Sequence, residues 1–341
     1  MKRMRLLALF IAIVAVALTG CSRQADPVIP ANADRSLLSG STASSGTGVN
    51  ETRGAPGDFE IMCTLYEISG AVYSDADQSG TRSPSEPGIA DVTVTILDDY
   101  GTVLQMATTD ASGAYSFLKY EGTYAVRIDA ATAANDFNET LASSFNATGP
   151  TSRTVTLGPD SPGNDFGFDP KTAEIGTQLD QGIILTTGEP ARFWQKQIRM
   201  AISGGRDHVE FDAATMAQFI AQIQGLFLPD PFRFTPGSEF EEALSILSTK
   251  SKDPLPLLRK ELLAAELNHV SGKGLVGAWE LQRALLAWAE SVVIAASSTV
   301  TPPASGGSIV PMGVIDTRVA DAYDLILKMN GAIGGGSGGG G

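Results

Sequence analysis

Residue types that often carry chemistry are scarce in this sequence, which has two cysteines and two histidines among 341 residues. His208 has no second histidine four residues away, the spacing of a helical zinc site. The sequence also lacks a Gly-x-x-x-x-Gly-Lys-Ser/Thr phosphate loop and a Gly-x-Ser-x-Gly elbow between a predicted strand and helix. We interpret His208 and His269 as structural or solvent-exposed. No nucleophile and base can be paired, so we predict that the protein is not an enzyme.

Long apolar runs are also scarce. The one unbroken run, residues 6–18, follows Lys2, Arg3 and Arg5. It is shorter than the about 20 residues that a membrane-spanning helix needs, but it has the length of a signal-peptide core. No other segment is long and apolar enough to cross a bilayer. We therefore predict a lipoprotein signal peptide over residues 1–20.

The apolar run ends in Leu18-Thr19-Gly20-Cys21, which resembles the lipobox of bacterial lipoproteins. The resemblance implies cleavage before Cys21 and attachment of diacylglycerol to its sulfur, so the membrane is an expected partner. The alternative is an ordinary secretory signal followed by a coincidental cysteine. Ser22 stands where an aspartate would signal retention at the inner membrane in Gram-negative lipoproteins. We expect a lipid-anchored protein of the cell envelope, on the outer membrane or cell surface and facing outward.

Large apolar residues are almost absent from residues 21–59, which are rich in serine, threonine and glycine. Such a segment cannot bury enough surface to offset the entropy of ordering, so we predict a disordered tether behind the lipidated cysteine. Lipidation of Cys21 would leave Cys63 without a partner, which excludes an intrachain disulfide. Cys63 lies among apolar neighbours and is expected to be a buried structural thiol.

Positive charge is scarce in the middle of the chain. The formal net charge is −14, and residues 59–170 hold 16 acidic and 4 basic side chains. This balance argues against nucleic acid or anionic lipid as a partner of this region, and it favours cation binding.

An acidic twelve-residue segment, residues 75–86, has the spacing of a calcium-binding loop. Side-chain oxygens recur along it, and Gly80 occupies the sixth position, where a sharp turn is needed. We predict calcium as the cofactor, with Ser83 bound directly or through water. The predicted ligands are Asp75, Asp77, Ser79, the Thr81 carbonyl, Ser83 and Glu86. The alternative is an acidic, solvated turn.

Alternating apolar and polar residues predict β-strands around this loop, separated by turn signals at the spacing of a sandwich. The expected strands are residues 68–73, 92–97, 102–106, 114–117, 123–128 and 154–157. We therefore predict a calcium-binding antiparallel β-sandwich over residues 60–169.

Four ordered motifs in this region resemble the B-type repeat of serine-aspartate-repeat surface adhesins, a Cna-B-like sandwich with an immunoglobulin-like fold. They are Gly70-Ala-Val-Tyr-Ser-Asp75-Ala-Asp77, Glu86-Pro-Gly88-Ile89, Thr109-Asp110-Ala-Ser-Gly113-Ala-Tyr115 and Gly122-Thr-Tyr124-Ala-Val126. The resemblance implies calcium-stiffened modules that act as rigid spacers on the cell surface and carry no catalysis.

The sequence departs from that repeat within and after the loop. Ser79 and Ser83 stand where the repeat usually has asparagine and aspartate, and Asp91 replaces a glycine. Fewer charged ligands imply weaker binding, in the range of about 10⁻⁴ to 10⁻³ M. Asp110 and Asp91 are candidates for a second metal site, although Asp-x-x-Gly is also an ordinary hairpin turn.

After residue 170 the apolar period changes from two to about 3.6, which predicts helices. We expect a linker over residues 170–187, an all-α bundle of about six helices over residues 188–330, and a glycine-rich tail over residues 331–341. Whether that tail is natural or an added linker stays open. The expected helices span residues 190–202, 213–227, 239–247, 254–268, 275–296 and 317–329, with Asp212 as one N-cap.

The segments around Trp194 and Asn268 are similar to a helical module of secreted bacterial proteins that has no established activity. This chain departs from the pattern by inserting Gln195 before Lys196. Two interpretations of Trp194 stay open. It could line a ligand groove, or it could anchor the packing at the start of a helix.

The combined prediction is a non-catalytic cell-surface lipoprotein in which a calcium-stabilised spacer presents a helical domain for adhesion or envelope interaction. A surface protein or polysaccharide is the expected partner besides the membrane. One alternative is a binding module whose helical domain captures a glycan or a partner protein near Trp194. A further alternative is a secreted enzyme whose site the sequence does not reveal.

Overall fold

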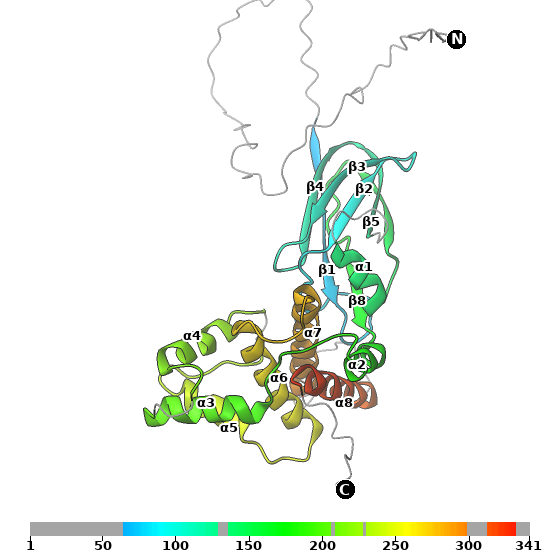
Figure 1. Cartoon of the computed structure of the whole chain (residues 1–341). Helices are drawn as coiled ribbons and strands as arrows, with labels where there is room; N and C mark the ends of the chain where they lie inside the picture. The colour runs from blue at the N-terminus through cyan, green and yellow to red at the C-terminus, as the bar shows by residue number, and fades with distance from the viewer. Residues whose placement is uncertain (1–63, 129–135, 206–208, 228–229, 299–311, 332–341) are drawn as a thin grey trace, which may run out of the picture.

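The computed structural model describes residues 64–128, 136–205, 209–227, 230–298 and 312–331. These residues form a sandwich of two sheets and a group of helices (Figure 1). We call residues 65–170 the β-module and residues 172–331 the helical module. The predictions for the signal peptide, the tether, Cys21, Cys63, His208 and the tail concern residues outside the described part.

The β-module consists of two four-stranded sheets, ordered β4-β1-β8-β6 and β3-β2-β5-β7. The strands are β1 (Leu65–Ser74), β2 (Thr93–Leu97), β3 (Val103–Thr108), β4 (Ala114–Tyr120), β5 (Gly122–Ile128), β6 (Phe145–Ala147), β7 (Ser152–Leu157) and β8 (Phe166–Pro170). Paired strands run antiparallel except β1 and β8, which are parallel, with Val72 opposite Phe166. The predicted sandwich is confirmed. The parallel pair is an exception within this antiparallel sandwich, and it arises because no hairpin connects these first and last strands.

Inward-facing side chains of both sheets form the core of the β-module. Ile68, Val94, Ile96 and Val126 are all 0% exposed, as the period-two pattern requires. A short helix that the sequence did not predict, α1 (Asp136–Ser144), packs beside β2. The Asn138 side chain of this helix accepts a hydrogen bond from the Thr93 backbone N–H and donates one to the Thr93 carbonyl, both at 2.8 Å.

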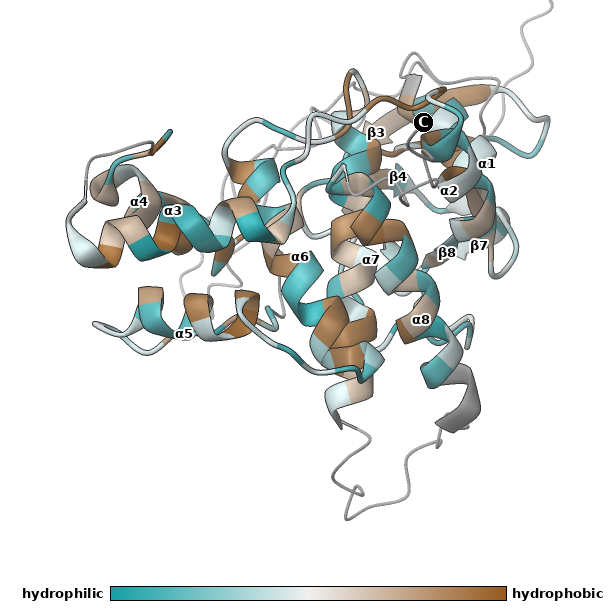
Figure 2. Ribbon diagram, turned by 60° about the horizontal axis from the view of Figure 1, so that its bottom comes forward, coloured by the Kyte–Doolittle hydropathy of each residue, from teal (hydrophilic) through white to brown (hydrophobic). Residues whose placement is uncertain are grey.

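The helical module contains seven helices within the described residues, and the all-α prediction is confirmed. They are α2 (Thr172–Asp180), α3 (Ala191–Ser203), α4 (Ala213–Ile223), α5 (Glu239–Leu247), α6 (Pro254–Val270), α7 (Trp279–Ser298) and α8 (Met312–Met329). Asp212 caps α4 by accepting a hydrogen bond from Thr215 N–H at 2.7 Å, as expected. Figure 2 shows brown and teal residues alternating around α3, the pattern of a helix with one buried face.

The linker expected over residues 170–187 needs correction, because it contains α2. This helix packs on α8, and its Asp180 forms an ion pair with Lys328 at 2.8 Å. α2 has only three buried residues, so its apolar pattern is short. Its position depends on contacts with α8, which is distant in the sequence.

Helix boundaries also differ from the prediction: α8 begins at Met312 rather than at residue 317, and α6 ends at Val270 rather than at residue 268. α7 begins at Trp279 rather than at residue 275, because Gly277 has a φ of 70° and Leu275 forms a β-bridge with Thr186. α4 ends at Ile223, four residues earlier than expected, and continues into a turn. Before α7 the Val276 N–H donates to the Leu185 carbonyl, and after α4 the N–H groups of Gly225 and Leu226 bond to the carbonyls three residues earlier, which forms a turn.

α6 and α7 form the centre of the helical module. Leu262, Leu263, Leu285 and Trp288 on these helices are each 0% exposed. α7 extends to the base of the sandwich, where it contacts β1 and β8 (Figure 1). None of the helices in the described ranges has the length and apolar character needed to cross a membrane.

Candidate metal centre

The acidic loop follows β1 directly and folds around the carboxylate of Asp75. The Ser79 N–H donates to Asp75 Oδ1 at 3.0 Å, and the Gly80 N–H donates to Oδ2 at 2.8 Å. The same Ser79 N–H also donates to Asp77 Oδ1 at 2.9 Å. Gly80 has a φ of 70°, a left-handed conformation that glycine adopts without strain, so this position forms the sharp turn that the spacing requires.

Three of the predicted ligands converge in space. Asp75, Asp77 and Glu86 each place one carboxylate oxygen within 4.8 Å of the other two. Asp75 is 0% exposed and Glu86 is 4% exposed, while Asp77 is half-buried. At an effective dielectric constant of about 20, two ionised groups this close repel each other by roughly 3 kcal/mol. A divalent cation between the three carboxylates would remove that repulsion.

Glu86 is the least satisfied member of this group. Its Oε2 accepts a hydrogen bond from the Ser83 N–H at 2.8 Å, but its buried Oε1 has no hydrogen-bond partner among the described residues. Burial, with Asp77 and Asp75 nearby, raises the pKa of Glu86 to about 7. A buried carboxylate oxygen without a donor is costly unless a proton or a cation binds it, and the fit to a metal ligand is good.

The three other predicted ligands hydrogen-bond within the loop. The Ser79 hydroxyl donates to the Thr81 carbonyl at 3.0 Å, and the hydroxyls of Ser83 and Ser85 lie 2.8 Å apart. These contacts hold their oxygens close to the loop backbone. Their coordination of a metal stays a prediction.

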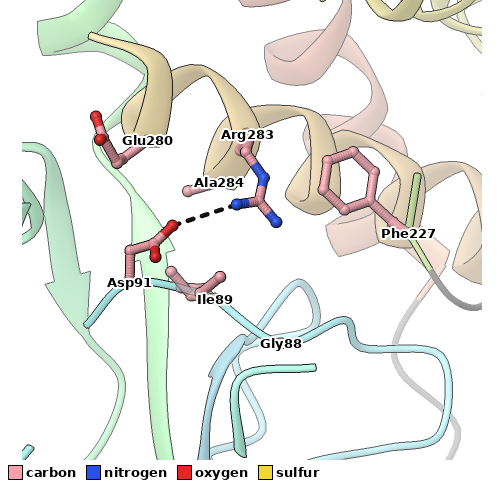
Figure 3. Close-up of a pocket in the computed structure, with 8 residues that line it drawn as sticks. Gly88, Ile89, Asp91, Phe227, Glu280, Arg283 and Ala284 are labelled. Carbon is pink, nitrogen blue, oxygen red and sulfur yellow. Dashed lines mark hydrogen bonds and ion pairs between the residues drawn. The ribbon is translucent and has the colours of Figure 1, made fainter. Parts of the chain in front are cut away.

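Asp91 and Asp110, the candidates for a second metal site, have other partners, and among the described residues neither belongs to a converging group of acidic side chains like that of the loop. Asp110 Oδ1 accepts hydrogen bonds from the N–H groups of Ser112 and Ala114 at 2.8 and 2.9 Å. Burial opposes ionisation of Asp110, but these bonds prevail and lower its pKa. Asp91 forms an ion pair with Arg283 of α7 at 3.2 Å, as Figure 3 shows. Asp91 has a φ of 65°, a conformation that suits the glycine it replaces.

The prediction that Trp194 lines a ligand groove is wrong, because its side chain is 0% exposed. Its Nε1 donates to Asn268 Oδ1 at 2.9 Å, and its ring stacks on Phe211 with centroids 5.7 Å apart. Asn268 also accepts a hydrogen bond from the Glu189 N–H and donates one to Asn330 Oδ1, both at 2.9 Å. The interpretation of Trp194 as a packing anchor is confirmed, and Asn268 joins four segments of the helical module.

Sequence reasoning missed a buried carboxyl pair in the helical module. Glu266 on α6 is 0% exposed and Glu290 on α7 is 1% exposed, and no other described residue donates a hydrogen bond to either carboxyl. Burial raises the pKa of both groups well above the usual range, and Glu290 raises that of Glu266 further. Asp230 adds to both shifts, and its own pKa rises to about 6 through burial. The two glutamates face each other closely enough to share one proton. Both lie away from solvent, so a substrate does not reach them in this structure.

The helical module also exposes several large apolar side chains. Leu185 is 58% exposed, Val276 is 54% exposed and Trp279 is 44% exposed, and we call these three residues the apolar patch. The Val276 N–H donates to the Leu185 carbonyl at 2.8 Å, which places their segments side by side. Trp279 stacks on His269 with centroids 3.8 Å apart. Burial, with Arg283 nearby, lowers the pKa of His269 to about 4, which agrees with a structural histidine.

Comparison with known proteins finds a family match for the β-module. Residues 66–168 match the model of the SdrD B-like domain. The bone sialoprotein-binding protein of Staphylococcus aureus strain MRSA252 is 40% identical to this chain over 65 residues. So is the serine-aspartate repeat-containing protein E of Staphylococcus aureus strain MSSA476. Each match covers 19% of this chain and 6% of the relative. The resemblance of the β-module to this repeat is confirmed.

Proposed function

We propose that this protein is a non-catalytic envelope protein in which a calcium-stabilised β-module presents the helical module to a partner. One observation carries the proposal: Asp75, Asp77 and Glu86 place their carboxylate oxygens within 4.8 Å of one another in a loop with calcium spacing. Calcium prefers six to eight oxygen ligands held by a flexible backbone. Ser79, Thr81 and Ser83 belong to the same loop and supply the remaining oxygens.

The match to the SdrD B-like domain supports the spacer role. It lies wholly within the β-module, so the helical module carries whatever contact is particular to this protein. Adhesion or envelope interaction is therefore assigned to the helical module. One relative is named for binding bone sialoprotein, but it shares only a short segment with this chain, and we do not extend that ligand to this protein.

The proposed location is the outer membrane or cell surface, through lipid on Cys21. The support is the lipobox-like ending of the apolar run, Leu18-Thr19-Gly20-Cys21. Substitution of Cys21→Ser is expected to move the protein from the membrane fraction to the soluble fraction. Retention of the variant in the membrane fraction would contradict the lipid anchor and leave the calcium site unaffected.

Calorimetric titration of the chelator-treated full chain tests the metal site. We expect calcium binding with a dissociation constant of about 10⁻⁴ to 10⁻³ M. The double variant Asp75→Asn and Glu86→Gln is expected to remove the signal. Asp110→Asn is the matched control, because its side chain stabilises an ordinary turn, and it is expected to bind as the parent does. A flat titration of the parent chain contradicts the proposal.

The apolar patch favours a second candidate function, capture of a partner protein by the helical module. Trp279 is its one large aromatic residue, and aromatic residues are frequent anchors in protein interfaces. The other two tryptophans, Trp194 and Trp288, are 0% exposed, so a change in tryptophan emission on mixing reports mainly on Trp279. We expect envelope proteins, rather than polysaccharides, to change the emission, and we expect Trp279→Ala to abolish the change. A response that persists in this variant contradicts the patch.

A further inference from the structure

The calcium loop lies near the junction between the two modules, and its neighbours on the β-module lead toward the helical module. At its start, the Asp75 N–H donates to the Phe168 carbonyl at 2.9 Å, on the strand that leads into the helical module. Beyond its end, Asp91 contacts Arg283 of α7. The segment between Glu86 and Asp91 lines a narrow pocket against Phe227, Glu280 and Ala284 (Figure 3).

A chain of side-chain contacts connects the middle of the loop to α8. Gln78 Nε2 donates to Asp169 Oδ2 at 2.8 Å, and Asp169 Oδ1 accepts a hydrogen bond from Arg318 Nη1. Asp169 is 6% exposed and Arg318 is 8% exposed, so solvent screens this contact weakly. Asp169 therefore binds the loop with one oxygen and the helical module with the other.

The conformation of Gln78 ties this contact to the shape of the loop. Gln78 has a φ of 58°, a left-handed conformation that is uncommon outside glycine and costs on the order of 1 kcal/mol. It stands between Asp77 and Ser79, two of the proposed ligands. A change in the loop backbone that relaxes this conformation also moves the side chain that reaches Asp169.

We propose that calcium in the loop strengthens the hold of the β-module on the helical module, through the contacts of Gln78 with Asp169 and of Asp169 with Arg318. This inference rests on the proposed calcium site. It adds that the site acts between modules as well as within one of them. The loop then sets both the stiffness of the spacer and the orientation of the part that the spacer presents.

Hydrogen exchange of α8 in the full chain, with calcium and with chelator, tests the inference. Because typical coupling between two sites is about 5-fold or more, we expect calcium to slow exchange in α8 at least about fivefold. In Arg318→Gln we expect calcium to leave α8 exchange unchanged. Lys328→Gln is the matched control: it removes the ion pair of α8 with Asp180, away from the β-module, and is expected to keep the calcium response.

A second variant guards against a folding defect in Arg318→Gln. Gln78→Asn keeps a residue type that tolerates the left-handed conformation but shortens the side chain by one methylene, so it no longer reaches Asp169. It is expected to bind calcium in the titration and to lose the response of α8.

Calcium titration of the same samples separates the two proposals. Binding without any change in α8 exchange of the parent chain overturns the coupling and leaves the calcium site standing. A flat titration overturns both. A calcium response of α8 that survives in both Gln78→Asn and Arg318→Gln shows that the coupling runs through other contacts, and it overturns the assignment to Asp169.

Discussion

Each module buries carboxyl groups close together, and the two backbones give them different chemistry. In the β-module, Asp75, Asp77 and Glu86 come from a loop whose N–H groups already bind the carboxylates of Asp75 and Asp77. In the helical module, Glu266 and Glu290 come from two packed helices whose N–H groups are used within the helices. The first arrangement suits a cation with many ligands, and the second suits a shared proton.

The difference shows that local backbone, rather than side-chain type, decides what a buried acid can bind. A loop can bring carbonyl and hydroxyl oxygens to the same point as its carboxylates, and a helix cannot. The β-module is therefore expected to respond to calcium and, when metal-free, also to pH through Glu86, while the helical module is expected to respond to pH through Glu266 and Glu290. The helical module further depends on direct side-chain hydrogen bonds, with Asn268 at their centre.

The largest expected effect tests that dependence on Asn268. Asn268→Ala removes the partners of Trp194 Nε1, of the Glu189 backbone and of Asn330, leaving buried polar groups unsatisfied. We expect a loss of about 3–5 kcal/mol in the unfolding free energy of the helical module, measured by chemical denaturation. Asn146→Ala, on an exposed position of β6, is the control and should change stability by less than about 0.5 kcal/mol. A loss below about 1 kcal/mol for Asn268→Ala contradicts the network.

The next effect concerns calcium and the β-module. At about 10 mM calcium and a dissociation constant of about 10⁻⁴ to 10⁻³ M, binding adds roughly 1.4–2.7 kcal/mol to the stability of the β-module. We expect its thermal transition to move upward in calorimetry with calcium and to return with chelator. Magnesium is the control, because it needs a tighter octahedral site and is expected to have a smaller effect. Superimposable scans with calcium and with chelator would show that this loop is a solvated acidic turn.

The pH response of the helical module follows from the raised pKa values of Glu266 and Glu290. The folded state holds more protons than the unfolded state above the ordinary glutamate pKa of 4.5, so stability is full below that pH and falls as pH rises. Asp230 acts in the same direction, since its pKa is raised to about 6. His269 opposes them up to its ordinary pKa of 6.5, because its folded pKa is lowered to about 4.

The variant Glu266→Gln isolates the pair from these other groups. It keeps the shape of the side chain and supplies an N–H donor to Glu290, so we expect the helical module to gain about 1–3 kcal/mol at pH 8. The gain should disappear at pH 4. Glu241→Gln, on an exposed position of α5, is the control and should not change the pH profile. Parallel profiles of Glu266→Gln and the parent between pH 4 and pH 8 would contradict the shared proton.

The smallest expected effect is at the junction. Asp91→Gly relieves the strain of the left-handed backbone at φ 65° and removes the ion pair with Arg283. The side chain of Asp91 is 48% exposed and that of Arg283 is 26% exposed. The relief of backbone strain and the loss of the ion pair each amount to about 0.5–1 kcal/mol and have opposite signs. We therefore expect the unfolding free energy from chemical denaturation to change by less than about 0.5 kcal/mol. A loss above about 1 kcal/mol would show that Asp91 contributes more to the junction than a partly exposed ion pair does.

Strong local patterns made most of the fold predictable. The alternation around Val94 and Val126, the Asp212 cap and the apolar spacing of α6 all express short-range chemistry that a single segment contains. α1 and α2 escaped prediction because each is short and depends on a distant partner, Thr93 for α1 and α8 for α2. In the candidate site, loop spacing pointed to Asp75, Asp77 and Glu86 because all of its ligands lie within twelve residues.

The sequence alone determined which residues are available to the acidic loop, since the order of oxygens and Gly80 is a local property. Only the tertiary structure decided the partners of residues far apart in the chain. It joined Asp91 to Arg283 and Asp169 to Arg318, buried Trp194 against Asn268, and brought Glu266 to Glu290. The physical reason is that burial and ion pairing depend on packing between segments, which no spacing within one segment encodes.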